Sequence, residues 1–195
     1  MKRSRGIQIK LSTAIALSTM ILVSVAGFIL YQVSFGINRT LVLSDIKNTA
    51  YRYANQVSTE LESMMASARS LASNFSRYKD IDPADRRRYF TSLLRTTLES
   101  NDRYYAVWTT WEPQALDSMD EAFVGDPASS DTGRFVATWY RDGDGFTLSG
   151  VSEEELATAD YYLLAKETRT EFLMEPYYYS YTGDAANEVF ETSIV

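Results

Sequence analysis

The sequence predicts an α+β fold, in which an N-terminal transmembrane helix and a long amphipathic helix precede an antiparallel sheet. Three observations support this fold class. Residues 11–38 contain no charged side chain, and apolar residues recur at helical spacing from residue 41 to residue 78. From residue 104 onward, aromatic and β-branched residues alternate with polar ones, which is the periodicity of half-buried strands.

The first element expected is a transmembrane helix over residues 11–31. At about 1.5 Å per residue, a helix of this length spans a hydrocarbon core of roughly 30 Å. The basic tail at residues 1–10 predicts a cytoplasmic N-terminus, an inner (cell) membrane location, and a periplasmic or extracellular position for residues 32–195. A cleaved signal peptide ending near Ala26 is the alternative. Because the apolar run continues to Val33, an uncleaved anchor is favoured.

A long amphipathic helix is expected next, over residues 41–78, where neither proline nor glycine occurs. Its apolar side chains are spaced alternately by three and four residues. The narrow stripe suits a helix that packs along a partner helix in a homodimer, or along a folded body, and both readings remain open. The stripe comprises Ile46, Ala50, Tyr53, Val57, Leu61, Met64, Ala68, Leu71 and Phe75.

A second helix is expected over residues 83–100. Asp82 suits the N-cap position, and Pro83 suits the first helical position. The residues expected to be buried are Tyr89, Phe90, Leu93, Leu94 and Leu98. Arg86, Arg87 and Arg88 are expected to form a solvated face.

Residues 104–195 are expected to form the sheet module. A strand begins at Tyr104 and stops at Pro113, and a hairpin covers residues 134–151 with its turn at Asp142–Gly145. Ser152 and Glu155 form a capping box before a short helix. Two further strands, around residues 172–181 and 188–195, meet at a turn at Thr182–Asp184. The module is expected to be truncated at its C-terminus.

The composition argues against an enzyme, since the chain has neither histidine nor cysteine. Asp117, Asp120 and Glu121 are nominal glycosidase carboxylates, but they read equally well as a polar turn. We expect no cofactor and no metal site. The Asp142–Gly145 turn only faintly resembles a calcium loop, because the downstream acidic ligands are absent.

The charge distribution argues against nucleic acid as a partner. Four of the 19 lysines and arginines lie in the first ten residues, which leaves 15 bases against 26 acids, a net charge of −11, for the remainder. Such a body repels nucleic acid and attracts cationic ligands.

Four stretches carry a family resemblance when they are taken in order: YYAVWTTWEPQALD, GRFVATWYRDGDG, ADYYLLAKET and MEPYYYSYTGD. The chain resembles the N-terminal part of a bacterial transmembrane chemoreceptor (methyl-accepting chemotaxis protein) with a double Cache sensor domain. The resemblance implies a PAS-like, membrane-distal Cache module that binds a small molecule, and a homodimer. A Cache sensor of a histidine kinase or a cyclic-dinucleotide enzyme is the alternative, and a membrane-anchored pilin-like or scaffold protein is an alternative of another class.

The resemblance also indicates a ligand class. Amino-acid-binding members carry an arginine two residues before a Trp-Tyr pair, and here the pair is Tyr161-Tyr162 and the arginine position is Ala159. They also carry a Tyr followed two residues later by an Asp, and here these positions are Tyr177 and Tyr179. A further family Asp would follow Val195. Because the arginine position is Ala159, the guanidinium that would bind the ligand carboxylate through two hydrogen bonds is missing.

The ligand-binding residues expected are Trp139, Asp160, Tyr161, Tyr162, Glu175, Tyr177 and Tyr179. Strand alternation places Tyr177, Tyr179 and Tyr181 on one face. Aromatic walls in an acidic domain favour an amine or a flat aromatic ring, with a carboxylate possible. The alternative is that these aromatic side chains form only the core of the module.

Overall fold

The computed structural model describes residues 2–195, with the side chains of residues 2–6, 8 and 9 excluded. The internal contacts divide the chain into two compact units, with the boundary between Glu60 and Leu61. Each unit is described by itself below.

The first unit consists of helix α1 (Lys2–Ser76) as far as Glu60, and the helix continues into the second unit. Both helices expected over residues 11–31 and 41–78 belong to α1, and no proline interrupts this part of the chain. Apolar side chains of residues 11–33 are exposed, for example Met20 at 70% and Val23 at 72%. The described part of α1 is long and apolar enough to cross a membrane. A signal sequence near an N-terminus has the same length and apolar composition.

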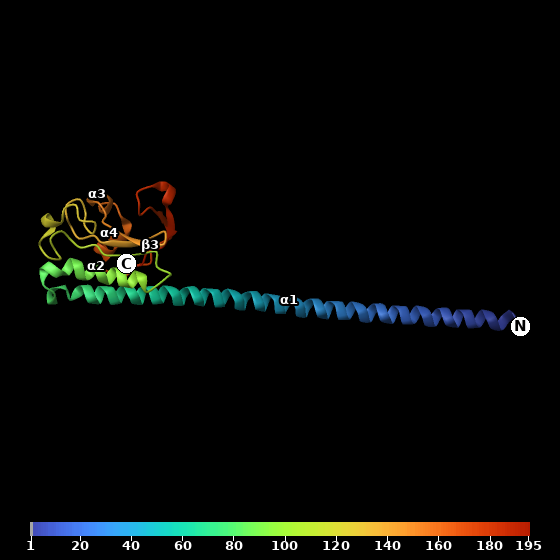
Figure 1. Ribbon diagram of the computed structural model, residues 1–195. Coiled ribbons are helices and arrows are strands. Elements are labelled where there is room, and N and C mark those ends of the chain that lie inside the picture. Colours follow the sequence, from blue (N-terminus) through green and yellow to red (C-terminus); the bar gives the residue numbers. More distant parts are fainter. Residues whose placement is uncertain (1) are drawn as a thin grey trace. The chain divides into compact units, whose positions relative to one another are not determined.

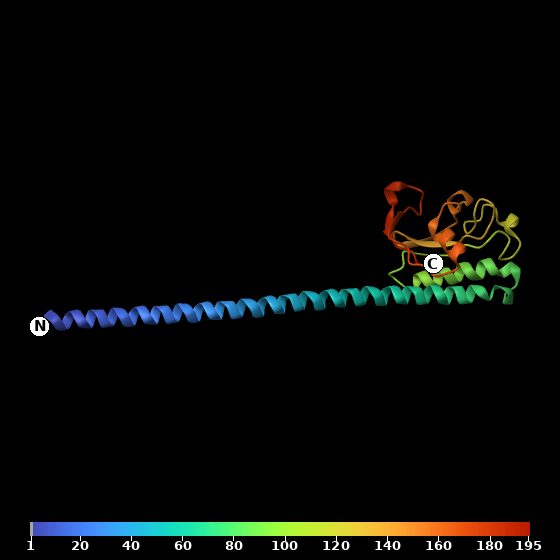
Figure 2. The same ribbon diagram turned by 180° about the vertical axis from the view of Figure 1, so that it is seen from behind.

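The second unit begins with two packed helices, the end of α1 and α2 (Pro83–Glu99). The short helix η1 (Tyr78–Asp80) connects them, and the Asp82 carboxylate caps α2 by accepting a hydrogen bond from the Ala84 amide at 3.0 Å. Figures 1 and 2 show α2 alongside the end of α1. The rings of Phe75 and Phe90 meet edge to face at 4.8 Å. The distal half of the α1 stripe therefore packs on the folded body, whereas Tyr53 and Val57 in the proximal half are exposed.

The solvated face expected at Arg86–Arg88 is wrong for Arg87, which is 5% exposed. Arg87 lies three residues before Phe90 in α2, so the helical period directs it toward the core. Its Nε donates to Asp117 at 2.6 Å and its Nη2 donates to Asp120 at 2.6 Å. Tyr89 was expected to be buried and is 48% exposed, because it lies one residue off the buried stripe. Two of the nominal glycosidase carboxylates are thus held in a buried ion pair.

A three-stranded antiparallel sheet packs on α2. It consists of β1 (Ala106–Trp108), β2 (Thr138–Asp142) and β3 (Gly145–Ser149), in the order β1-β2-β3. The strand register pairs Val107 of β1 with Trp139 of β2, and Asp142 of β2 with Gly145 of β3. The expected hairpin is confirmed, and Gly143 at φ 56° supplies the positive φ that its tight turn requires. On the α2 side, Val107 belongs to the core cluster with Leu94 and Leu98.

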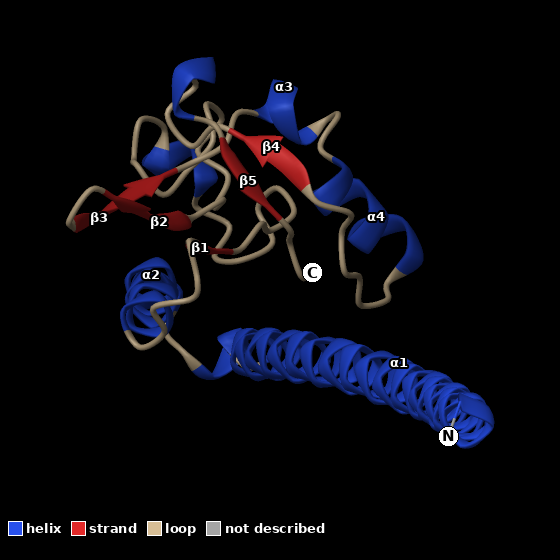
Figure 3. Cartoon of the chain, turned by 90° about the vertical axis from the view of Figure 1, so that its right-hand side faces the viewer, coloured by secondary structure: helices blue, strands red, loops and turns tan. Residues whose placement is uncertain are grey.

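A second, two-stranded antiparallel sheet consists of β4 (Tyr177–Tyr179) and β5 (Val189–Glu191). Helices α3 (Glu153–Leu156) and α4 (Asp160–Thr168) lie between the sheets in sequence, and η2 (Asp120–Phe123) and η3 (Ala185–Asn187) are short 3-10 turns. Ser152 caps α3 as expected, accepting from the Glu155 amide at 3.2 Å. Figure 3 shows α2 on one side of β1–β3, and α3 with the β4–β5 ribbon on the other. The α+β class is confirmed, but the expected sheet is divided into two.

Candidate ligand-binding site

Five aromatic side chains, from β1, α4, β4 and the loop that follows β4, converge between the two sheets. They line a small cavity of about 20 Å³, together with Thr110, Thr138, Val151 and Glu191. The rings of Trp108 and Tyr161 are 5.1 Å apart, and those of Tyr179 and Tyr181 are 4.7 Å apart. We call this set, Trp108, Tyr161, Tyr177, Tyr179 and Tyr181, the tyrosine cluster.

The local structure explains why these rings meet. In β4, alternation turns Tyr177 and Tyr179 inward and leaves Tyr178 67% exposed. Tyr181 follows the same parity just beyond the strand, as the sequence predicted. The first turn of α4 supplies Tyr161, and β1 supplies Trp108 on the face opposite to the buried Val107.

Two carboxylates accept hydrogen bonds from three of the four tyrosine hydroxyls of the cluster, and the fourth, that of Tyr177, bonds with the Ser193 hydroxyl at 2.6 Å. Glu155 Oε1 accepts from Tyr179 at 2.7 Å and from Tyr161 at 3.4 Å. The two oxygens of Glu191 accept from the Tyr181 hydroxyl at 2.9 and 2.8 Å. Glu191 thus lines the cavity together with the phenols, and Glu155 bonds to two of the phenols without lining the cavity itself.

The ionisation of these groups is shifted by their burial. Burial, followed by repulsion from Glu155, raises the pKa of the Tyr161 phenol, and burial is also the largest cause of the raised pKa values of Tyr179 and Tyr181. These phenols therefore stay neutral and act as donors at physiological pH. Burial also raises the pKa of Glu191, and hydrogen bonds from Tyr181 and Tyr177 oppose the rise.

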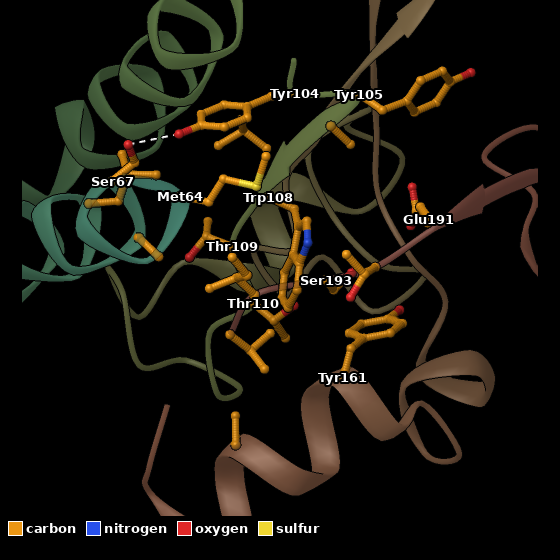
Figure 4. Close-up of a pocket in the computed structure, with 18 of the residues that line it drawn as sticks. Met64, Ser67, Tyr104, Tyr105, Trp108, Thr109, Thr110, Tyr161, Glu191 and Ser193 are labelled. Carbon is orange, nitrogen blue, oxygen red and sulfur yellow. Dashed lines mark hydrogen bonds between the residues drawn. The ribbon is translucent and has the colours of Figure 1, made fainter. Parts of the chain in front are cut away.

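A larger cavity of about 670 Å³ adjoins the cluster and shares Trp108, Thr110, Tyr161, Tyr181 and Glu191 with the small one. Figure 4 shows its opposite wall on α1, where Ser67 accepts a hydrogen bond from the Tyr104 hydroxyl at 2.8 Å. The remaining walls come mainly from residues 103–112, which include β1, from α4 and from residues 189–195.

The structure brings together three of the seven residues expected at the site, Tyr161, Tyr177 and Tyr179. Tyr162 lines only the larger cavity, where its hydroxyl donates to Glu112 at 2.7 Å and accepts from Arg134 Nη2 at 2.7 Å.

Trp139, Asp160 and Glu175 do not line either cavity, which corrects the expected set. Alternation along β2 turns Trp139 toward α2, where its indole N–H donates to the Thr91 carbonyl at 2.9 Å. Asp160 and Glu175 are exposed, at the start of α4 and before β4.

Sequence reasoning missed Trp108, Glu155 and Glu191 as site residues. In the sequence, Trp108 is only one of several aromatic residues in a stretch that alternates between apolar and polar side chains. The sequence pattern assigned Glu155 to a capping box, but in the structure its carboxylate accepts from Tyr179 and Tyr161 instead. Glu191 lies in an expected strand, but the local sequence does not show that its carboxylate would meet the Tyr181 hydroxyl. Among residues 2–195 as described, no group of three carboxylates is arranged to hold a metal ion.

Comparison with known proteins identifies sensor domains as relatives. No family model matches the chain. Methyl-accepting chemotaxis protein TlpQ of Pseudomonas aeruginosa is 32% identical over 111 residues, which cover 50% of this chain and 16% of that protein. The extracellular domain assigned to histidine kinase mmHK1S-Z2 is 28% identical at a TM-score of 0.63, covering 73% of this chain and 49% of that domain.

Two further solved structures share the fold. The mmHK1S-Z3 extracellular domain is 25% identical at a TM-score of 0.59, covering 73% of this chain and 54% of that domain. Methyl-accepting Chemotaxis protein X, at 23% identity, has a TM-score of 0.64, with 80% of this chain and 56% of that chain covered. The chain thus spans about half of these solved structures and about a sixth of the curated relative.

The comparisons confirm the resemblance to the sensor part of a chemoreceptor. The chain is similar to extracellular sensor domains of the chemoreceptor and histidine-kinase type. Together with one apolar N-terminal helix, this fits a membrane-anchored receptor.

Proposed function

We propose that this chain, with its likeness to extracellular sensor domains, is the small-molecule sensor of a transmembrane chemotaxis receptor. Residues 1–10 would be cytoplasmic, 11–31 would cross the inner membrane, and 32–195 would form the extracytoplasmic Cache-type domain. The helix that carries the apolar segment, α1, also lines the larger cavity through Met64 and Leu71. A ligand that favours one arrangement of the cavity wall would therefore bias the position of α1, and through it the membrane helix.

The observation that carries the proposal is the tyrosine cluster with its two carboxylates. Ring faces attract cations and stack on flat rings, and Glu155 and Glu191 would complement a positive charge. We propose an amine or a flat aromatic ring as the ligand. The net charge of −11 outside the tail would raise the local concentration of cations.

Arg134, which donates to the Tyr162 hydroxyl, is poorly placed to bind a carboxylate ligand. Arg134 donates to the Trp111 carbonyl, to Glu153 at 3.0 Å and to Tyr162 at 2.7 Å, so each of its nitrogens already has an acceptor. Its side chain is 5% exposed. At the position where amino-acid-binding members carry arginine, Ala159 is 9% exposed and caps α4 without a side-chain bond.

Thermal-shift measurements on the extracytoplasmic part of the intact receptor test this proposal. We expect amines or purines to raise the Tm, and organic acids to leave it unchanged. The Tyr161→Leu variant removes one ring of the cluster and should lose the ligand-induced shift. Tyr178→Leu is the matched control. Tyr178 lies in β4 between Tyr177 and Tyr179, and its side chain faces away from the tyrosine cluster. A rise in Tm with carboxylates alone would overturn the proposed ligand class. No change in Tm with any compound tested would favour a scaffold role.

A histidine kinase output is a second candidate, favoured by the likeness to the two histidine-kinase extracellular domains. The sensor and its site would be unchanged. The domain encoded after the membrane-spanning part of the receptor gene distinguishes this output from a chemotaxis signalling domain.

Homodimerisation through the proximal stripe of α1 is a further part of the proposal. Ile46, Tyr53 and Val57 are exposed at 59%, 67% and 54%, on one helical face. Because the chain has no cysteine, Val57→Cys would introduce a unique thiol. We expect oxidation to cross-link this variant into dimers in membranes, and Ser58→Cys, on another face, to cross-link much less. Equal cross-linking of the two variants would argue against the seam.

A further inference from the structure

A group of polar and charged side chains lines the larger cavity outside the tyrosine cluster. It consists of Glu112, Tyr162 and Lys166, which we call the lysine group. Trp108, Thr110 and Glu112 line the cavity at every second position from β1 onward, as alternation along an extended segment requires. Tyr162 and Lys166 are four residues apart in α4 and therefore lie on one face of that helix.

The three side chains of the lysine group close a ring of hydrogen bonds. The Lys166 ammonium lies 3.0 Å from Oε1 and 3.1 Å from Oε2 of Glu112, and it donates to the Tyr162 hydroxyl at 3.0 Å. This hydroxyl donates to Glu112 at 2.7 Å and accepts from Arg134 at 2.7 Å, so all of its bonding capacity is used. The Glu112 carboxylate is thus occupied by a positive charge of the chain itself.

Both members of the ion pair are charged at neutral pH. Hydrogen bonds with Tyr162 and Glu112 raise the pKa of Lys166. Burial alone would raise the pKa of Glu112, but the hydrogen bonds from Tyr162 and Lys166 outweigh it, and the pKa is lowered. The pair therefore adds no net charge to the cavity wall. Because both side chains are half-exposed, loss of the lysine should leave the fold intact.

Glu191 has partners of a different kind. Its two oxygens accept from the Tyr181 hydroxyl, which is a neutral donor, at 2.9 and 2.8 Å. The influences on its pKa are its burial and the hydroxyls of Tyr181 and Tyr177, and none of these carries a positive charge. Among the described residues, Glu112 and Glu191 are the carboxylate side chains that line the cavity, and a lysine neutralises only Glu112.

We infer that Lys166 determines the charge of the ligand, so that the cavity accepts an amine with one positive charge and rejects a diamine. The inference rests on the proposed function for the amine class and adds the number of charges. Glu191 complements the first ammonium of a ligand. A second ammonium finds Glu112 already neutralised and lies near a like charge, which is the repulsive element that discrimination requires.

The cavity is large enough for this discrimination to operate. Its volume of about 670 Å³ is in the range of pockets that hold a whole small molecule. Glu112 follows β1 and Glu191 lies in β5, so the two carboxylates belong to different sheets. Diamines of increasing chain length sample the span between them.

Isothermal titration calorimetry of the intact receptor in detergent micelles tests the inference. The probes are butylamine, pentylamine and hexylamine, each compared with the diamine of the same chain length, so that only the second ammonium differs. We expect the wild type to bind the monoamines more tightly. Lys166→Met removes the charge and keeps an unbranched side chain, and it should raise the ratio of diamine to monoamine affinity by about fivefold or more at the best-fitting length.

Two controls separate the ion pair from the overall charge. Lys79→Met removes the same charge from a lysine whose Nζ lies 5.6 Å from the centre of the Tyr78 ring and which lines neither cavity. At physiological ionic strength it should change the ratio by less than about 1.5-fold, because salt screens distant charges. Adding Glu112→Gln to Lys166→Met should return the ratio to the wild-type value, because the freed carboxylate is the source of the gain.

Three outcomes would overturn the inference. The first is a ratio that is unchanged in Lys166→Met or that rises equally in Lys79→Met. The second is loss of monoamine binding in Lys166→Met, which would show that the lysine contacts the ligand directly. The third is tighter binding of the diamines than of the monoamines by the wild type.

The same titrations separate this inference from the proposed function. Monoamine binding by the wild type, with an unchanged ratio in Lys166→Met, would keep the amine sensor and remove the role of Lys166. Binding of neither class by the wild type would contradict the amine ligand. A gain of diamine binding in Lys166→Met would then still support the assignment of Lys166, and no gain would overturn both.

Discussion

Replacement of Arg87 by methionine is expected to destabilise the second unit strongly, because Arg87 lies on the buried face of α2. All five guanidinium N–H groups have acceptors: two bonds go to Asp117, and one each to Asp120, Ser129 and the Gly133 carbonyl. The side chains of Arg87, Asp117 and Asp120 are 6%, 0% and 6% exposed. Arg87→Met would leave two carboxylates in the interior without a counter-charge.

The magnitude follows from that burial. Breaking one buried ion pair by removing a partner costs about 3–5 kcal/mol. Because one cation here neutralises two carboxylates, we expect a loss of about 5 kcal/mol in the free energy of unfolding, comparable with the whole stability of a small domain. Arg88→Met is the matched control. Its ion pair with Asp85 is solvent-exposed, at 82% and 55%, and should contribute at most about 0.5 kcal/mol.

Urea denaturation followed by tryptophan fluorescence measures both variants. The three tryptophans, Trp108, Trp111 and Trp139, all lie in the second unit, so the signal reports its unfolding. Replacing all three members of the ion-pair group by apolar residues should recover part of the loss. A cost below about 1 kcal/mol for Arg87→Met would refute the reasoning, because it would mean that water reaches these carboxylates.

Three further predictions concern the packing and the site. Gly150→Ala would drive a Cβ into the Ser129 carbonyl and should lower the free energy of unfolding by about 2 kcal/mol or more. In the control Gly145→Ala, the Cβ would lie 3.6 Å from the Asp142 oxygen, and the loss should be less than about 1 kcal/mol. Equal thermal midpoints of the two variants would contradict the close approach at Gly150. The raised pKa of Glu191 means that its contribution to stability is present below its unfolded pKa and is lost as pH rises through its folded pKa. Glu191→Gln should therefore gain stability relative to the wild type between pH 4 and pH 7.5 in urea titrations, and a constant difference would show that Glu191 is solvated. Trp139→Phe should leave ligand affinity unchanged in calorimetric titration, because Trp139 faces α2; a large loss of affinity would place it at the site after all.

Elements with local signals were predictable from the sequence. Asp82 before Pro83 marked the start of α2, and the glycine-containing turn at Asp142–Gly145 marked the β2–β3 hairpin. Strand alternation predicted that Tyr177, Tyr179 and Tyr181 share a face. Each of these depends only on residues close together in the chain.

Features that depend on distant partners were not predictable. Arg87 was read as solvated because Asp117 and Asp120, its partners, lie 30 and 33 residues further on. Trp139 was expected at the site as one of the aromatic residues of the module, but both faces of β2 carry aromatic residues, and the sequence pattern does not tell which face meets α2. The division into two sheets depends on which strands pair with one another, and the local sequence does not specify that pairing.

Isothermal titration calorimetry of the sensor domain of the intact receptor, with the ligand that gives the largest thermal shift, tests the central proposal most directly. The account predicts saturable binding of an amine or flat aromatic compound to the wild type and to Tyr178→Leu, and loss of at least about tenfold in affinity for Tyr161→Leu. Unchanged affinity in Tyr161→Leu, or binding only of carboxylates, would contradict the assignment of the tyrosine cluster as the ligand site.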